Sequence, residues 1–103
     1  DEELSVEDFL KRLEGTKVAG VYEVKGSDGV VKIIACAQDL HLAVSEHRGH
    51  AGGDCKSIRA EAFKFPSKET LDEKVGEWIE ELGYTPAGNL GGSAAWGDTV
   101  GEA

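Results

Sequence analysis

The sequence predicts an α+β domain in which a small three-stranded sheet, mixed or antiparallel, is flanked by three helices. Residues 18–37 contain two β-rich runs joined by Gly-Ser-Asp-Gly, a composition typical of a hairpin. Residues 67–83 have apolar side chains at helical spacing between a serine cap and a glycine stop. We expect the order α-β-β-α-β-α over residues 1–89, followed by an extended, glycine-rich C-terminal tail at 90–103.

The first helix is predicted over residues 5–14, because Ser5 is a good N-cap and Gly15 a typical stop. Its apolar stripe consists of Val6, Phe9, Leu10 and Leu13. The hairpin strands are predicted at 18–24 and 30–37. The second is apolar on both faces except at Lys32, which favours a central strand covered on both sides.

A second helix is predicted after Asp39, with one apolar side followed by a glycine-rich loop at 48–54. That side is formed by Leu40, Ala43, Val44 and His47. The loop lacks the pattern of a phosphate-binding loop. The alternation of residues 58–63 predicts the third strand, and the last helix follows Pro66-Ser67. The apolar stripe of this helix is Leu71, Val75, Trp78, Ile79 and Leu82.

Charge argues against nucleic-acid binding. The chain has 103 residues, with 20 acidic against 11 basic side chains and a net charge of −9. The basic residues are scattered among acids, and such a surface repels a phosphate backbone. The sequence contains no apolar run of the ~18 residues that a membrane helix needs.

The cysteine and histidine pattern predicts neither a metal site nor a cofactor. Cys36 and Cys55 are interpreted as free thiols in a reducing compartment, although a single disulfide is the other option. No CxxC motif or zinc-like His/Cys spacing occurs. We therefore expect His41, His47 and His50 to be surface histidines. A redox or small-ligand module built on the two cysteines has no supporting spacing.

The chain begins at Asp1, which suggests a product of processing or trimming. An organelle, with a plastid favoured, is the expected compartment, and the cytoplasm is the alternative.

Two short stretches on the predicted hairpin carry a family resemblance. Gly20-Val21-Tyr22 lies on the first strand, and Ile33-Ile34-Ala35 lies on the second. In this order on these elements, the chain resembles a GIY-YIG nuclease domain from about residue 17 to 89. Three further features match that family: residues 36–40 that lead into the second helix, His47 near the end of that helix, and the run 85–89. The resemblance implies the α-β-β-α-β-α fold, with a tyrosine, an arginine and a metal-binding glutamate as the catalytic set.

The chain departs from that set at most positions, so the resemblance is to a degenerate member. Tyr22 is the relic candidate for the tyrosine that activates water. Ile33 occupies the place of the second tyrosine, and Ala43 that of the arginine. Glu77 matches the metal-binding glutamate only if the helical register slips, because the better register places Val75 there. Losing one preorganised electrostatic group costs a factor of ~10² to 10³ in rate.

The sequence therefore favours a non-catalytic accessory or structural subunit that binds a larger protein assembly through its sheet edge and its tail. In the tail, Trp96 is the expected partner anchor, together with Leu90 and Val100. Trp96 folding back onto its own domain is the competing interpretation. The alternative function is a weak or relic DNA endonuclease that uses Mg²⁺.

Overall fold

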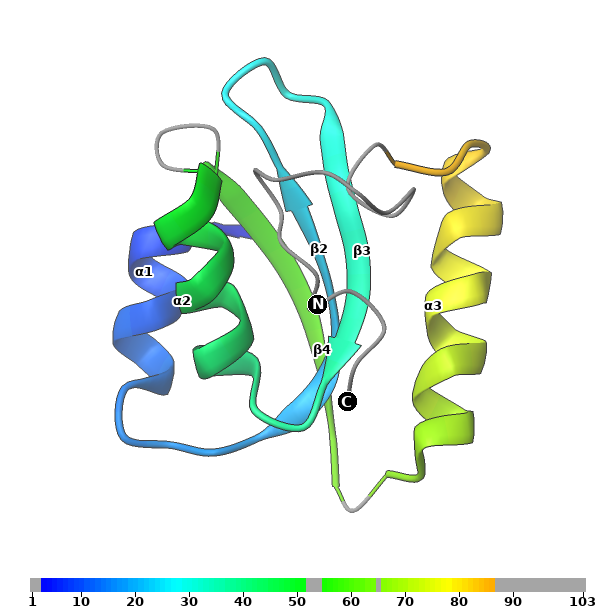
Figure 1. Ribbon diagram of the computed structural model, residues 1–103, viewed down its shortest axis with the longest axis horizontal. Helices are drawn as coiled ribbons and strands as arrows, with labels where there is room; N and C mark the ends of the chain where they lie inside the picture. The colour runs from blue at the N-terminus through cyan, green and yellow to red at the C-terminus, as the bar shows by residue number, and fades with distance from the viewer. Residues whose placement is uncertain (1–2, 52–54, 65, 87–103) are drawn as a thin grey trace.

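The protein is a three-layer α+β domain with a sheet between two helical layers (Figure 1). The computed structural model describes residues 3–51, 55–64 and 66–86. Its elements, in order, are β1 Glu3–Ser5, α1 Val6–Leu13, β2 Ala19–Lys25, β3 Val31–Ala37, α2 Leu40–Ala51, β4 Ser57–Phe63 and α3 Lys68–Leu82. Helices α1 and α2 cover one face of the sheet, and α3 covers the other. The predicted fold class is confirmed.

The sheet has four strands rather than the expected three, in the order β1-β4-β2-β3, and every pairing is antiparallel. The additional strand is β1, which pairs with Ser57–Arg59 of β4. The Glu3 carboxylate helps to hold it, because it accepts hydrogen bonds from Lys25 Nζ at 3.1 Å and from Ser57 Oγ at 3.0 Å. A three-residue strand with one apolar side chain has no usable alternation, so its pattern alone does not predict it.

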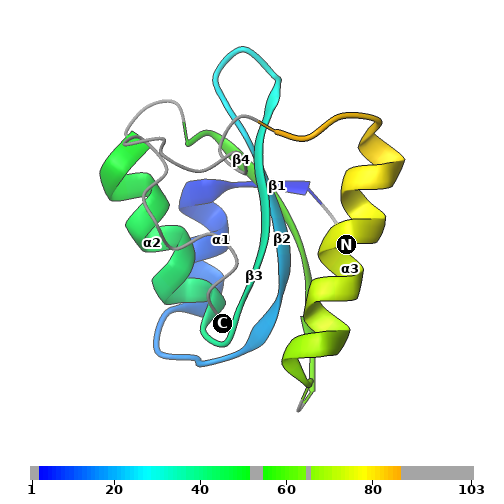
Figure 2. The same ribbon diagram turned by 45° about the vertical axis from the view of Figure 1, so that its right-hand side comes forward.

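The prediction that residues 30–37 form a central strand is wrong. β3 lies at the edge of the sheet and pairs with β2 (Figure 2). It is apolar on both faces because helices cover both: Ile33 and Ala35 pack beneath α1 and α2, whereas Ile34 and Cys36 pack beneath α3. Burial on two faces therefore identifies the layers around a strand and not its place within the sheet.

The helix ends follow the predicted signals, except that of α2. The Asp8 and Thr70 backbone N–H groups donate to Ser5 Oγ and Ser67 Oγ, at 3.2 and 3.1 Å, which caps α1 and α3. Gly83 ends α3 at φ 93°, in the left-handed region that suits glycine. Helix α2 continues to Ala51, whereas the glycine content predicts a loop from residue 48.

Two apolar cores lie on either side of the sheet. The larger core, between the sheet and α1 with α2, contains Val6, Phe9, Tyr22, Val24, Ile33, Ala35, Ala37, Leu40, Val44, Cys55 and Ile58. The smaller core, beneath α3, contains Val21, Val31, Ile34, Cys36, Leu71 and Trp78. The apolar stripe of α3 therefore packs against the sheet as predicted. Across the described residues, no helix is long and apolar enough to cross a membrane.

Candidate functional site

Tyr22 and His47 meet inside the larger core. The period of two along β2 turns Tyr22 toward α1 and α2, and the spacing from Leu40 and Val44 turns His47 of α2 toward the sheet. The Tyr22 hydroxyl lies 2.6 Å from His47 Nε2, and the two residues are 1% and 0% exposed. This hydrogen bond connects β2 to α2 through a region otherwise filled by apolar side chains.

The expectation that His47 is a surface histidine is wrong. It lies seven residues after Leu40 and three after Val44, so it belongs to the buried side of α2. Its burial is compatible with folding because Tyr22 supplies a hydrogen-bonding partner. The helical spacing signals this position, but the polar residue type favours the surface.

The environment of Tyr22 keeps its phenol neutral. Burial is the largest cause that raises the pKa of the Tyr22 hydroxyl, since an ionised phenolate loses its hydration in the core. Negative charge on Cys36, Cys55 or Glu46 raises the pKa of Tyr22 in the same direction. A general base must reach the proton that it abstracts, directly or through one water molecule. The hydroxyl of Tyr22 is instead enclosed with His47.

The other positions of the expected catalytic set do not converge on Tyr22. Ile33 is fully buried, and Ala43 packs at the margin of the same core. Glu77 lies on α3, where its carboxylate is exposed and 3.5 Å from Lys74 Nζ. Because α3 covers the opposite face, the sheet separates Glu77 from Tyr22 (Figure 1). Val75 packs against the smaller core, as the better helical register predicts.

Both cysteines are free and buried, in agreement with the free-thiol interpretation. Cys36 Sγ donates to Asp72 Oδ1 at 3.7 Å, and burial, followed by the charge of Asp72, raises the pKa of this thiol. Within residues 3–51, 55–64 and 66–86, no group of three or more His, Cys, Asp and Glu side chains is arranged to hold a metal ion.

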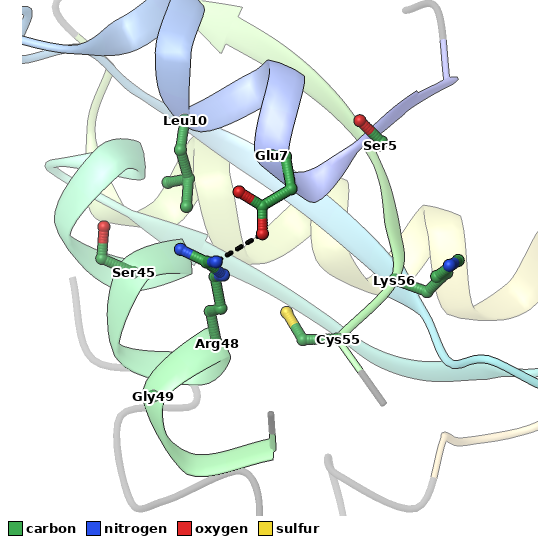
Figure 3. A pocket seen from close by; sticks show the side chains of 8 residues that line it. All are labelled: Ser5, Glu7, Leu10, Ser45, Arg48, Gly49, Cys55 and Lys56. Atoms are coloured by element: carbon green, nitrogen blue, oxygen red, sulfur yellow. Dashed lines mark ion pairs between the residues drawn. The ribbon is translucent and has the colours of Figure 1, made fainter. Parts of the chain in front are cut away.

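A cavity of about 580 Å³ lies between α1, α2 and the segment that leads into β4 (Figure 3). It is lined by Ser5, Glu7, Leu10, Ser45, Arg48, Gly49, Cys55 and Lys56. Arg48 extends from α2 to an ion pair with Glu7 of α1, and the Cys55 thiol points into the space beside it. The guanidinium is thus paired with the one acid among the described residues of the lining, and Lys56 is the other basic residue among them.

A second cavity, of about 460 Å³, lies at the end of the sheet where β2 begins and β3 and β4 end. We call it the end cavity; it is lined by Lys17, Val18, Ala19, Gln38, Ala62, Phe63, Lys64 and Pro66. Most of this lining is apolar, and its charged members are two lysines. Beside it, residues 60–63 of β4 extend beyond Arg59, the last residue that pairs with β1 in the described sheet. Neither feature has a signal in the sequence, since both depend on strand order.

The expected partner anchors Leu90, Trp96 and Val100, and the side chain of His50, lie outside what the structure describes. The larger core thus encloses the hydroxyl of Tyr22, and the end cavity is an apolar recess beside an incomplete strand pairing. Comparison with known proteins adds no relative: no family model matches the chain, and no curated protein matches it.

Proposed function

We propose that this chain is a non-catalytic protein-binding domain, built on a GIY-YIG-like scaffold, that serves as an accessory subunit of a larger assembly. One observation carries the proposal: the Tyr22 hydroxyl is buried and hydrogen-bonded to His47 at 2.6 Å. In the family that the sequence resembles, the corresponding tyrosine must reach a water molecule and accept its proton. An enclosed phenol with a raised pKa is suited to packing and not to that role.

The placement of the remaining positions supports the same conclusion. Ile33 and Ala43 have no polar group that could act on a phosphate. Glu77 lies across the sheet from Tyr22, so a metal held there would not be near the tyrosine. The net charge of −9 also repels DNA. A Mg²⁺-dependent endonuclease remains the alternative, and the two functions differ in a cleavage assay.

The surface that we assign to partner binding is the outer half of β4, residues 60–63. Beyond Arg59 this strand has no β1 partner among the described residues, so backbone groups on that side are available for an added strand. Ala62 is exposed there, so its side chain would lie beside that of an added strand. A strand added at this edge would pair with β4 and contact the apolar rim of the end cavity.

Co-elution from extract of the native host tests this surface. The variants are Ala62→Arg, which places a long charged side chain at the β4 edge, and Glu73→Arg, at an exposed site on α3. We expect the wild-type chain and Glu73→Arg to elute with a high-mass complex, and Ala62→Arg to elute at the volume of the free chain. Elution of the wild-type chain as a free monomer, or retention of Ala62→Arg in the complex, would contradict the proposal.

A further inference from the structure

We propose that the C-terminal segment 90–103 of this chain docks onto its own domain, with the Trp96 side chain in the end cavity. The cavity is an apolar recess of about 460 Å³ that includes Val18, Ala62 and Phe63. Phe63 is half-buried and Ala62 is exposed, so apolar surface faces solvent there. A tryptophan that covers such a surface buries ~150–250 Å² of its own area, which favours docking.

Charge complementarity selects this segment as the occupant. Lys17 and Lys64 are the charged residues of the lining, and neither forms an ion pair within the described part of the chain. Segment 90–103 contains Asp98 and Glu102 and no Lys or Arg. With Trp96 in the cavity, Asp98 follows two residues later, at most ~7 Å along an extended chain and thus inside the Debye length of ~8 Å at physiological salt; Glu102 lies four residues further on.

The chain is long enough for docking within one molecule. Pro66, in the cavity wall, is two residues before α3, and Pro86 is four residues after the end of this helix. The 15 residues of α3 therefore set a separation of roughly 22 Å between the two ends. Trp96 lies ten positions after Pro86, a distance of up to ~33 Å when the chain is extended. Gly88, Gly91 and Gly92 allow this stretch to turn back along α3.

Docking would place the segment beside Ala62 and the outer half of β4. The segment would then compete with a partner strand for the outer half of β4. This consequence rests on the function proposed above, whereas the docking itself does not. The two proposals therefore fail separately: docking is measured on the isolated chain, and partner binding is measured by co-elution from extract.

Fluorine NMR of the full chain labelled with 5-fluorotryptophan tests the docking. The chain contains two tryptophans, and Trp96→Phe assigns their resonances. We expect the Trp96 resonance to differ in chemical shift from that of a labelled 90–103 peptide, at a value that does not change on dilution. Lys17→Glu with Lys64→Glu, and separately Ala62→Glu, should move it toward the peptide value.

The matched control is Lys11→Glu with Lys56→Glu, which makes the same charge change at exposed lysines outside the end cavity. This variant should leave the Trp96 resonance in place. A wild-type Trp96 resonance that coincides with the peptide value would overturn the proposal. The proposal would also be overturned if Lys11→Glu with Lys56→Glu moved the Trp96 resonance as far as Lys17→Glu with Lys64→Glu does. A Trp96 resonance whose chemical shift changes with protein concentration would also contradict the proposal, because it would show that the segment docks onto a second copy of the chain.

Discussion

The Tyr22 hydroxyl and His47 Nε2 lie 2.6 Å apart within a core that is otherwise apolar, and both side chains are buried. The hydrogen bond between the Tyr22 hydroxyl and His47 Nε2 replaces the hydrogen bonds to water that these two atoms lose on burial. The pair therefore joins the sheet to α2 and accounts for a tyrosine and a histidine at positions where the fold alone would accept aliphatic residues. The same geometry encloses the hydroxyl of Tyr22, the one tyrosine of the expected catalytic set.

We expect Tyr22→Phe to destabilise the protein by ~1–3 kcal/mol, because it leaves a buried nitrogen of His47 without the hydroxyl. Urea unfolding of the full chain measures this loss. Tyr84→Phe is the matched control, since Tyr84 is 49% exposed and its substitution should change little. Equal stability of the two variants would show that the buried hydrogen bond contributes nothing.

Tyr22 also predicts a loss of stability at alkaline pH. Its pKa is raised in the folded protein, whereas in the unfolded chain it returns to about 10. Below that value both states hold the proton and the stabilisation is complete. Above it the unfolded chain releases its proton while the folded chain keeps it, so stability falls with rising pH by up to ~1.4 kcal/mol per unit.

Urea unfolding at about pH 9 and about pH 11 measures this effect, and Tyr22→Phe separates it from the titration of lysines. The decline between the two values should be smaller in the variant than in the wild-type chain. An identical decline in both proteins would assign the alkaline sensitivity to other groups.

Gly20 is expected to be intolerant of a side chain. It pairs with Ala62, and a Cβ at this position would collide with the backbone carbonyl oxygen of Glu61. The backbone of β4 cannot move aside as the end of a flexible side chain can, so Gly20→Ala should lower the free energy of unfolding by ~1–3 kcal/mol. Thermal unfolding provides the measurement.

Gly76→Ala is the control, because a Cβ there meets open space within helix α3. This substitution should stabilise the protein by up to ~1 kcal/mol, since alanine is the better helix former. Two changes of the same chemistry are thus expected to have opposite signs. A neutral Gly20→Ala would show that β2 and β4 can separate at this point.

The ion pair of Glu7 and Arg48 is expected to contribute little. The two side chains are 63% and 49% exposed, so water already solvates both charges. Arg48→Met should therefore cost less than ~1 kcal/mol, and this cost should disappear near 1 M NaCl, where the Debye length falls to ~3 Å. A larger loss that persists in high salt would indicate that the Arg48 stem packs against the cavity wall.

Local signals in the sequence predict much of this fold, because helix caps, helix stops and strand alternation each depend on residues that are close together in the chain. Ser5 and Ser67 cap helices, Gly83 ends one, and the alternation along β2 assigns Tyr22 and Val21 to opposite faces. The place of β3 at the edge is not predictable in this way, since pairing order depends on residues far apart in the chain. The short β1 likewise depends on its contacts with β4.

The site is predicted less well, for a related reason. Tyr22 is identified from a local motif, but whether its hydroxyl meets water or His47 depends on the packing of α2 against the sheet. The separation of Glu77 from Tyr22 depends on which face α3 covers. The end cavity requires three strand ends to meet, and no single stretch of sequence contains that information.

A cleavage assay tests the central claim most directly. The full wild-type chain and Tyr22→Phe are incubated with linear and branched DNA in the presence of Mg²⁺, with circular dichroism confirming that both are folded. A buried, hydrogen-bonded Tyr22 predicts no cleavage by either protein. Mg²⁺-dependent cleavage by the wild-type chain that is lost in a folded Tyr22→Phe variant would contradict it.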